Sequence, residues 1–186
     1  MSMPNTARAW TLAELHRLPD DGNKYELVYG ELYVTPPPTE EHETIAARLT
    51  RVLDPYVATQ RLGLVYRPRA VVQRRKSEVE PDLMVRAERM RRKGSWRGAP
   101  VPLLVVEILS PTTRRRDHVK KRAYYEDIGV PEYWIVDAGE RTVRVVRPNA
   151  EDVVETKTLR WMPAGAARAL AISVAELFAG VQPGEE

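Results

Sequence analysis

The chain has 186 residues, a formal net charge of +3 and no cysteine. A chain of this length normally forms one domain, and it can bury a core large enough to need no disulfide or metal staples. The absence of cysteine excludes disulfide frameworks, thiolate metal sites and cysteine nucleophiles. No uncharged apolar run reaches about 18 residues and no signal peptide is recognisable, so we expect a soluble protein of the reducing cytoplasm without a membrane partner.

Positive charge is concentrated in clusters along the chain, although the net charge is small. The clusters are Arg67 with Arg69, residues 74–76, residues 86–93 and residues 114–122. Together with a sequence pI of about 9.2, such clusters favour a polyanionic partner. Each cluster by itself is equally typical of a solvated loop or helix face.

The first third of the chain predicts a short helix, a hairpin and a long helix. Thr11 and Glu14 form a capping box that opens the short helix TLAELHRL. The segment YELVYGELYVTPPP predicts two strands around a turn at Tyr29 and Gly30. From Thr39 onward, apolar and semi-apolar residues recur at helical spacing. They are His42, Ile45, Ala46, Leu49, Val52, Leu53 and Tyr56.

The rest of the chain predicts short apolar strands and one further long helix. Strands are predicted at residues 64–73, 81–85, 102–109, 132–138 and 142–148, and the helix at residues 115–128. An edge strand is predicted at residues 153–159, a closing helix at 174–180 and a mobile arginine-rich flap at 86–100. This order predicts a mixed α/β (α+β) fold.

Glu107 is the most informative residue, because it lies inside the apolar run LLVVEIL. A lone ionised carboxylate would be costly to desolvate there. Period-two alternation predicts that Leu103, Val105, Glu107 and Leu109 share one face of the strand. A compensating cation is therefore needed, either an arginine in a structural ion pair or a bound metal.

Asp82 provides a second acid, directly after Pro81 at the start of a predicted strand. A Pro-Asp pair by itself is typical of a simple turn. Two hard carboxylates from adjacent strands can nevertheless hold a divalent cation such as magnesium, with water and phosphate completing the octahedron. We therefore predict a metal site at Asp82 and Glu107, with the carbonyl of Ile108 as a third ligand.

The second long helix offers two lysines, Lys120 and Lys121. Steps of about 100° per residue place Lys121 in the same arc as Tyr124 and Tyr125, whereas Lys120 lies off that arc. An ammonium near the metal carboxylates would orient or deprotonate the attacking water and neutralise charge developing on phosphate. The alternative for Lys121 is an ordinary i,i+4 pair with Asp117.

Other polar and aromatic residues have simpler explanations. Residues 110–112, Ser-Pro-Thr, are expected to cap the next helix, although they could touch a phosphate. Tyr125, Tyr133 and Trp134 could stack on bases, but Tyr133 and Trp134 alternate within a strand and are expected in the core. His42 is expected to be a packed helix residue, and the spacing of the 3 histidines disfavours a zinc site.

These motifs resemble the Uma-two family, a branch of the PD-(D/E)XK superfamily to which restriction endonucleases belong. The resemblance lies in PDLMV, in VVEILSPTT, in Lys121 and Tyr125, and in GVPEYWIVD. The hairpin with EEH and the long helix after it are also similar, so the likeness covers about residues 11–147. It implies one nuclease-like domain over residues 1–186, with a C-terminal strand and short helix at about 150–181.

The superfamily has a mixed sheet flanked by helices, the restriction endonuclease-like fold, in which two acids bind magnesium or a similar ion and a lysine assists hydrolysis. The resemblance assigns the acids to Asp82 and Glu107. The usual lysine position, two residues after the second acid, is Leu109 in this chain. The resemblance therefore implies that the lysine has moved to the following helix, as Lys121.

An additional upstream acid is also implied by the resemblance. Glu26, in the first strand of the hairpin, is the preferred candidate, and Glu31 and Glu43 compete with it.

The leading hypothesis is a magnesium- or manganese-dependent endonuclease that hydrolyses DNA phosphodiester bonds. A homodimer would supply two active sites for a double-strand cut. Alternatives are a non-catalytic nucleic-acid-binding or interaction module on the same fold, and an enzyme acting on RNA or on intermediates of a mobile element. No Gly-rich phosphate loop, GxSxG elbow or dinucleotide fingerprint is present, which excludes those chemistries.

Overall fold

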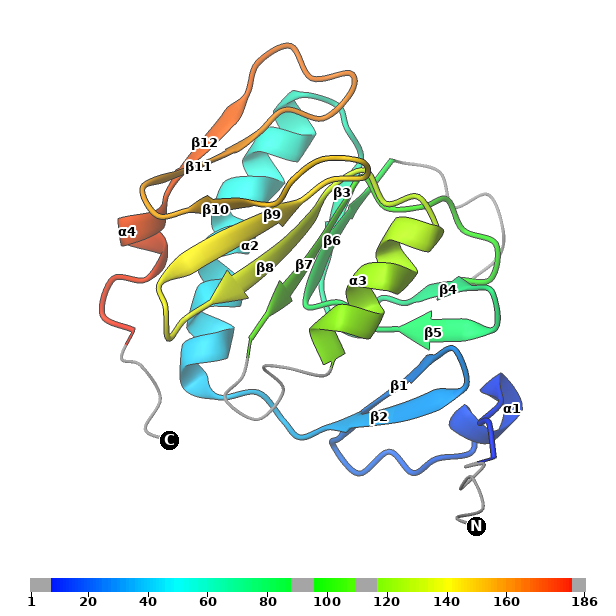
Figure 1. Ribbon diagram of the computed structural model, residues 1–186. Helices are drawn as coiled ribbons and strands as arrows, with labels where there is room; N and C mark the ends of the chain where they lie inside the picture. Colours follow the sequence, from blue (N-terminus) through cyan, green and yellow to red (C-terminus); the bar gives the residue numbers. More distant parts are fainter. Residues whose placement is uncertain (1–7, 88–95, 110–116, 182–186) are drawn as a thin grey trace.

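The computed structural model describes residues 8–87, 96–109 and 117–181 (Figure 1). Its helices are α1 (Leu12–Leu15), α2 (Glu40–Thr59), α3 (Asp117–Asp127) and α4 (Val174–Leu177). Its first six strands are β1 (Lys24–Val28), β2 (Glu31–Thr35), β3 (Leu64–Tyr66), β4 (Val72–Arg74), β5 (Ser77–Val79) and β6 (Leu83–Arg86). The others are β7 (Leu104–Ile108), β8 (Tyr133–Asp137), β9 (Thr142–Val146), β10 (Val153–Glu155), β11 (Thr158–Trp161) and β12 (Leu170–Ser173).

The largest sheet is mixed and has the strand order β10-β9-β8-β7-β6-β3. β7 and β8 run parallel, and every other neighbouring pair is antiparallel. A parallel pair needs a crossover connection, and α3 lies in that connection. The hairpin β1–β2 belongs to a second, antiparallel sheet of order β2-β1-β5-β4, and β11 pairs with β12. The predicted mixed sheet flanked by helices is confirmed.

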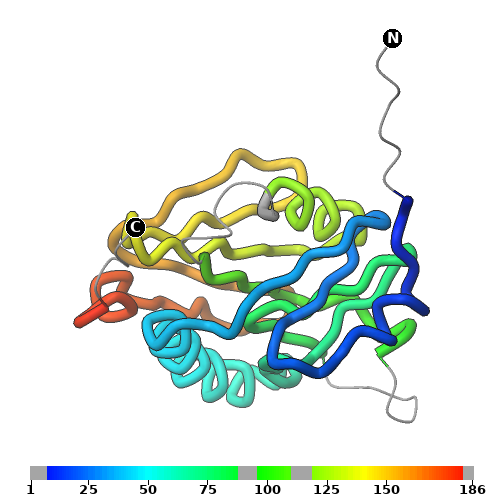
Figure 2. The backbone as a smooth tube through the Cα atoms, turned by 90° about the horizontal axis from the view of Figure 1, so that it is seen from below, coloured from blue at the N-terminus to red at the C-terminus, as the bar shows by residue number. Residues whose placement is uncertain are grey.

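The two faces of the six-stranded sheet are covered by different elements. α2 packs against β3, β6 and β7, and its residues Ile45, Leu49 and Leu53 are fully buried there. α3 lies on the opposite face, where Tyr124 and Tyr125 are buried in a separate apolar cluster. Figures 1 and 2 show α2 and α3 on opposite sides of the strands. The apolar stripe predicted for the long helix is thus the stripe that α2 buries.

The N-terminal elements follow the predicted local signals. Thr11 caps α1, its hydroxyl accepting from the Glu14 amide while the Glu14 side chain returns to the Thr11 amide, as a capping box requires. In the β1–β2 hairpin, Tyr29 and Gly30 both have positive φ, 50° and 85°, which suits the tight turn between the strands. Thr39 caps α2, where the long helix was predicted to begin.

The short strands differ most from the prediction. The segment 64–73 forms β3 and the start of β4, which lie in different sheets, because the turn around Pro68 interrupts it. The single edge strand predicted at 153–159 is two strands, β10 and β11, in different sheets. β5 and β12 were not predicted, because strands of three or four residues are too short for a clear period-two pattern.

Most of the predicted flap, residues 88–95, and Ser110 to Thr112 lie outside the described residues. None of the helices in the described segments combines the length and the apolar character that crossing a bilayer requires.

Candidate active site

The strand pair β6–β7 brings the two predicted acids together. Leu83 is paired with Val106 in this antiparallel ladder, so the next residues outward, Asp82 and Glu107, lie opposite each other. Alternation places them on the α3 face of the sheet, the same face as Val105. Asp82 is 5% exposed and Glu107 is 4% exposed. Two carboxylates from adjacent strands are thus buried side by side, as the sequence predicted.

The predicted face of this strand is correct with one exception. Val105 and Leu109 pack in the same cluster on the Glu107 face, but Leu103 packs against the α2-side core. Leu103 precedes the first residue of β7, so strand alternation does not apply to it.

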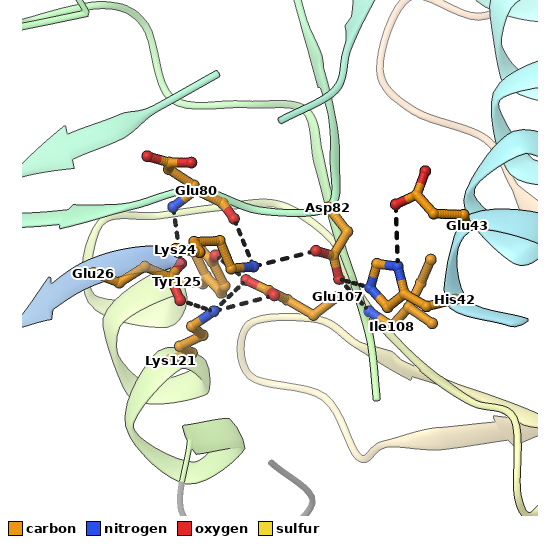
Figure 3. Close-up of polar contacts among 10 residues, drawn as sticks. All are labelled: Lys24, Glu26, His42, Glu43, Glu80, Asp82, Glu107, Ile108, Lys121 and Tyr125. Carbon is orange, nitrogen blue, oxygen red and sulfur yellow. Dashed lines mark hydrogen bonds and ion pairs between the residues drawn. The ribbon is translucent and has the colours of Figure 1, made fainter. Parts of the chain in front are cut away.

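Lys121 of α3 reaches these carboxylates, as the predicted helix face requires (Figure 3). Its Nζ lies 3.1 Å from both Oε1 and Oε2 of Glu107 and 2.7 Å from Oε2 of Glu26. Lys120 points elsewhere and pairs with Glu31 on the surface. The facing argument is therefore correct, and the contacts of Lys121 are with Glu26 and Glu107.

Glu26 is the upstream acid that the structure places in the cluster. It is 1% exposed, and its Oε1 accepts a 2.8 Å hydrogen bond from the amide of Glu80. Glu31 is more than half exposed and pairs with Lys120. Glu43 is also exposed and does not touch Glu26 or Lys121 in the described structure. Of the competing acids, only Glu26 lies beside the two central carboxylates.

Lys24 is a member of the cluster that the sequence analysis missed. Its Nζ lies 3.2 Å from Oδ1 of Asp82 and 3.2 Å from the backbone oxygen of Glu80. Lys24 and Glu26 are two positions apart in β1, so their side chains point to the same face of the strand. This alternation was the available signal, because a strand that directs Glu26 to the site also directs Lys24 there.

His42 also contacts the site, which the expectation of simple helix packing did not include. It lies in the first turn of α2, and its Nε2 is 3.1 Å from Oδ2 of Asp82. The same oxygen accepts a 2.8 Å hydrogen bond from the amide of Ile108. Ile108 therefore contacts Asp82 through its amide, and its carbonyl as a metal ligand stays a prediction.

The three aromatic residues considered for base stacking are buried. The hydroxyl of Tyr125 donates a 2.7 Å hydrogen bond to Oε1 of Glu107, and the side chain is 1% exposed. Tyr133 and Trp134 are core residues on opposite faces of β8, as predicted. Tyr125 thus orients a carboxylate and presents no face for stacking.

The environments of the two central acids move their pKa values in opposite directions. Burial disfavours the charged form of Asp82, but the Lys24 ammonium and the contact with His42 outweigh it and hold the pKa of Asp82 below its ordinary value. Burial raises the pKa of Glu107, and the attraction of Lys121 and Lys24 offsets this only in part. Adjacent carboxyls with diverging pKa values are typical of catalytic sites.

The surrounding carboxylates favour the charged form of both lysines. Burial by itself would lower the pKa of Lys121, but the carboxylates of Glu107 and Glu26 raise it above its ordinary value. Burial likewise opposes the charge on Lys24, and Glu26 with Asp82 raises the pKa of that side chain as well. The same cations hold the pKa of Glu26 below its ordinary value despite complete burial.

Two side chains of the site offer oxygen donors of the kind that a hard divalent cation binds. Asp82 and Glu107 offer carboxylate oxygens from adjacent strands, which is the ligand chemistry that Mg²⁺ prefers when water and substrate complete its shell. Within the described segments, no group of three or more His, Asp or Glu side chains has an arrangement that would hold a metal ion.

Comparisons with known proteins agree with this fold. A family model named Uma2 and described as "Putative restriction endonuclease" matches residues 12–175. A crystal structure of a "putative nuclease belonging to DUF820" from Anabaena variabilis is similar with a TM-score of 0.77 and 26% identity, over 91% of this chain and 97% of that one. Among curated proteins, none matches. Because the family model covers most of the chain, the protein belongs to the Uma2 family, within the PD-(D/E)XK superfamily.

Proposed function

We propose that this protein is a metal-dependent endonuclease that hydrolyses DNA phosphodiester bonds. The observation that carries the proposal is the contact of Lys121 with both oxygens of Glu107, beside Asp82 on the neighbouring strand. The family description and the similar crystal structure, both given as nucleases, support the same class of reaction.

Asp82 and Glu107 would hold the divalent ion, magnesium or manganese, with the carbonyl of Ile108 as a third ligand. When bound, such an ion polarises a phosphate oxygen and lowers the pKa of a bound water. The protein's part is to fix both carboxylates. The amide of Ile108 holds Asp82, and the hydroxyl of Tyr125 holds Glu107.

Lys121 would stabilise negative charge that develops on the phosphate during hydrolysis. Its raised pKa keeps it protonated, which favours charge stabilisation and water orientation over proton abstraction by this residue. Glu26 holds the ammonium at 2.7 Å and thereby positions it beside Glu107. We assign Glu26 a positioning role.

Exposed basic residues of the described structure would grip the DNA backbone. Arg69 and Arg75 keep side-chain exposures of 60% and 62%, although they also pair with Asp20 and Asp127. Contacts of this kind bind phosphates without reading the base sequence. Sequence-specific cutting would therefore need further contacts, for example from a second subunit in a homodimer.

A second candidate is a non-catalytic nucleic-acid-binding module. One observation favours it, because Lys121 and Tyr125 already contact Glu107 while Lys24 neutralises Asp82. Buried carboxylates that are fully paired can serve structure alone.

Nicking of supercoiled plasmid distinguishes the two candidates. We expect the wild-type protein to relax plasmid with Mg²⁺ or Mn²⁺ and to show no nicking in EDTA. The nicking rates of Glu107→Gln and Lys121→Met should be lower by about 10²–10³-fold. Glu31→Gln and Lys157→Met are matched controls, since both residues are exposed and outside the cluster. Circular dichroism verifies that each variant is folded. If the folded wild type binds DNA but never cuts it under any of these metal conditions, the binding-module function replaces the nuclease.

A further inference from the structure

The ammonium of Lys24 occupies an environment made of oxygen atoms (Figure 3). It lies 3.2 Å from Oδ1 of Asp82 and 3.2 Å from the backbone oxygen of Glu80, and the Glu26 and Glu107 carboxylates also attract it. Carboxylate and carbonyl oxygens are the ligands that hard divalent cations take in proteins. Lys24 thus uses, as a monovalent cation, oxygens of the kind that a metal ion would use.

The two lysines of the cluster differ in how firmly they are held. Lys121 has oxygen contacts of 2.7, 3.1 and 3.1 Å with two carboxylates, and its side chain is 7% exposed. Lys24 has two contacts of 3.2 Å, and its side chain is 19% exposed. Longer, partly exposed contacts are easier to replace, so Lys24 is the less firmly held of the two cations.

The positive charges already present in the cluster lower its affinity for a divalent ion. The cluster holds three carboxylates, those of Glu26, Asp82 and Glu107, and two ammonium groups, and the imidazole of His42 also contacts Asp82. A divalent ion that enters beside both ammonium groups would meet two nearby positive charges, which opposes its binding. Movement of Lys24 away from Asp82 would remove one of them.

We propose that Lys24 is the internal counter-cation of the metal-free site, and that a divalent ion binds by displacing its ammonium from Asp82. The inference rests on the proposed metal site at Asp82 and Glu107 and adds a regulation of it. In the absence of the ion, Lys24 keeps the buried acids neutralised and the site assembled. When the ion is present, it competes with the Lys24 ammonium for the oxygens of Asp82. Binding therefore needs a higher ion concentration than it would without this lysine.

Ion affinity without DNA tests the proposal. We expect calorimetric titration with Mn²⁺ to show binding to Lys24→Met that is about tenfold or more tighter than binding to the wild type, because an opposing charge next to the ligands is gone. Lys24→Arg keeps the charge and should not show this gain. Lys157→Met removes an exposed lysine outside the cluster and should match the wild type.

Thermal unfolding provides a second readout for folded protein. In EDTA, Lys24→Met should melt below the wild type, because Asp82 has lost its ammonium partner. Mn²⁺ should then raise the melting temperature of Lys24→Met more than that of the wild type, since tighter binding stabilises the folded state more.

Two results would overturn the inference, and they differ in what they say of the nuclease. If the wild type nicks plasmid with metal but folded Lys24→Met binds Mn²⁺ no more tightly, only the role of Lys24 is wrong. If the wild type, Lys24→Met and Glu107→Gln all fail to bind Mn²⁺, the proposed metal site is wrong. The proposed role of Lys24 is then wrong as well.

Discussion

The two faces of the six-stranded sheet are built from alternating residues of the same strands, yet their chemistry differs. Toward α2, the strand β7 directs Leu104, Val106 and Ile108 into an apolar core. Toward α3, the same strand directs Val105 and then Glu107, which is buried among charged groups. One strand thus contributes both to a packed core and to an ionic cluster.

The α2 face contributes mainly to the stability of the fold, whereas the α3 face carries the charged groups of the candidate site. Apolar burial on the α2 face stabilises the fold at roughly 25 cal/mol per Å² without demanding exact partners. Buried ion pairs on the α3 face lose in desolvation much of what they gain by attraction, and they are strongly destabilised when one partner is missing. The α3 face is therefore the part of the molecule where a small change has the most specific consequence.

Removal of Lys121 should have the largest effect. Lys121→Met leaves Glu26 and Glu107 buried without their shared cation, so we expect a loss of about 3–5 kcal/mol in the free energy of unfolding, measured with urea in EDTA. The double variant Glu107→Gln/Lys121→Met should recover part of that loss. A loss below about 1 kcal/mol in the single variant would mean that the cluster is well solvated, against the burial described above.

A core truncation on the α2 face should also destabilise, but without changing the chemistry. Leu49 is fully buried in α2, so Leu49→Ala should lower the free energy of unfolding by about 3 kcal/mol. At a temperature where the variant remains folded, its plasmid-nicking rate per folded molecule should equal that of the wild type. A selective drop in that rate would show that the two faces are coupled.

Tyr125→Phe tests the contribution of a single hydrogen bond on the α3 face. The substitution keeps the buried ring but removes the hydrogen bond to Glu107, so we expect a loss of about 1.5–3 kcal/mol, as for a bond to a charged acceptor. Nicking should slow as well, because the carboxylate loses one of its fixed partners. Tyr124→Phe, whose hydroxyl points to backbone oxygens near β4, is the matched control for nicking. Equal nicking by both variants would argue against an orienting role for Tyr125.

The smallest effect is expected at Lys120, the neighbour of Lys121 along α3. Its partner Glu31 is 57% exposed and its own side chain is 43% exposed. Exposed pairs contribute little, so Lys120→Met should change the free energy of unfolding by less than about 1 kcal/mol. A change as large as that of Lys121→Met would contradict the assignment of the inward face of α3.

Much of the site could be predicted because its residues stand out locally. Glu107 interrupts an apolar strand, and Lys121 follows from helical spacing, which depends only on nearby residues. His42 was missed because its significance depends on which elements pack around Asp82, whereas Lys24 could have been found from its alternation with Glu26 in β1. No local pattern states that the first turn of α2 and the strand β1 converge on the start of β6.

The sequence by itself determined the order of the long elements, the N-terminal hairpin, the caps of α1 and α2, and the central acids with their lysine. These features follow from short-range periodicity, backbone preferences and the expense of burying a lone charge. Tertiary structure alone decided that β3 and β4 separate into two sheets, that β10 and β11 do likewise, and that Lys24 and His42 meet Asp82. Contacts between residues distant in sequence depend on how whole elements pack, and that packing is a property of the complete chain.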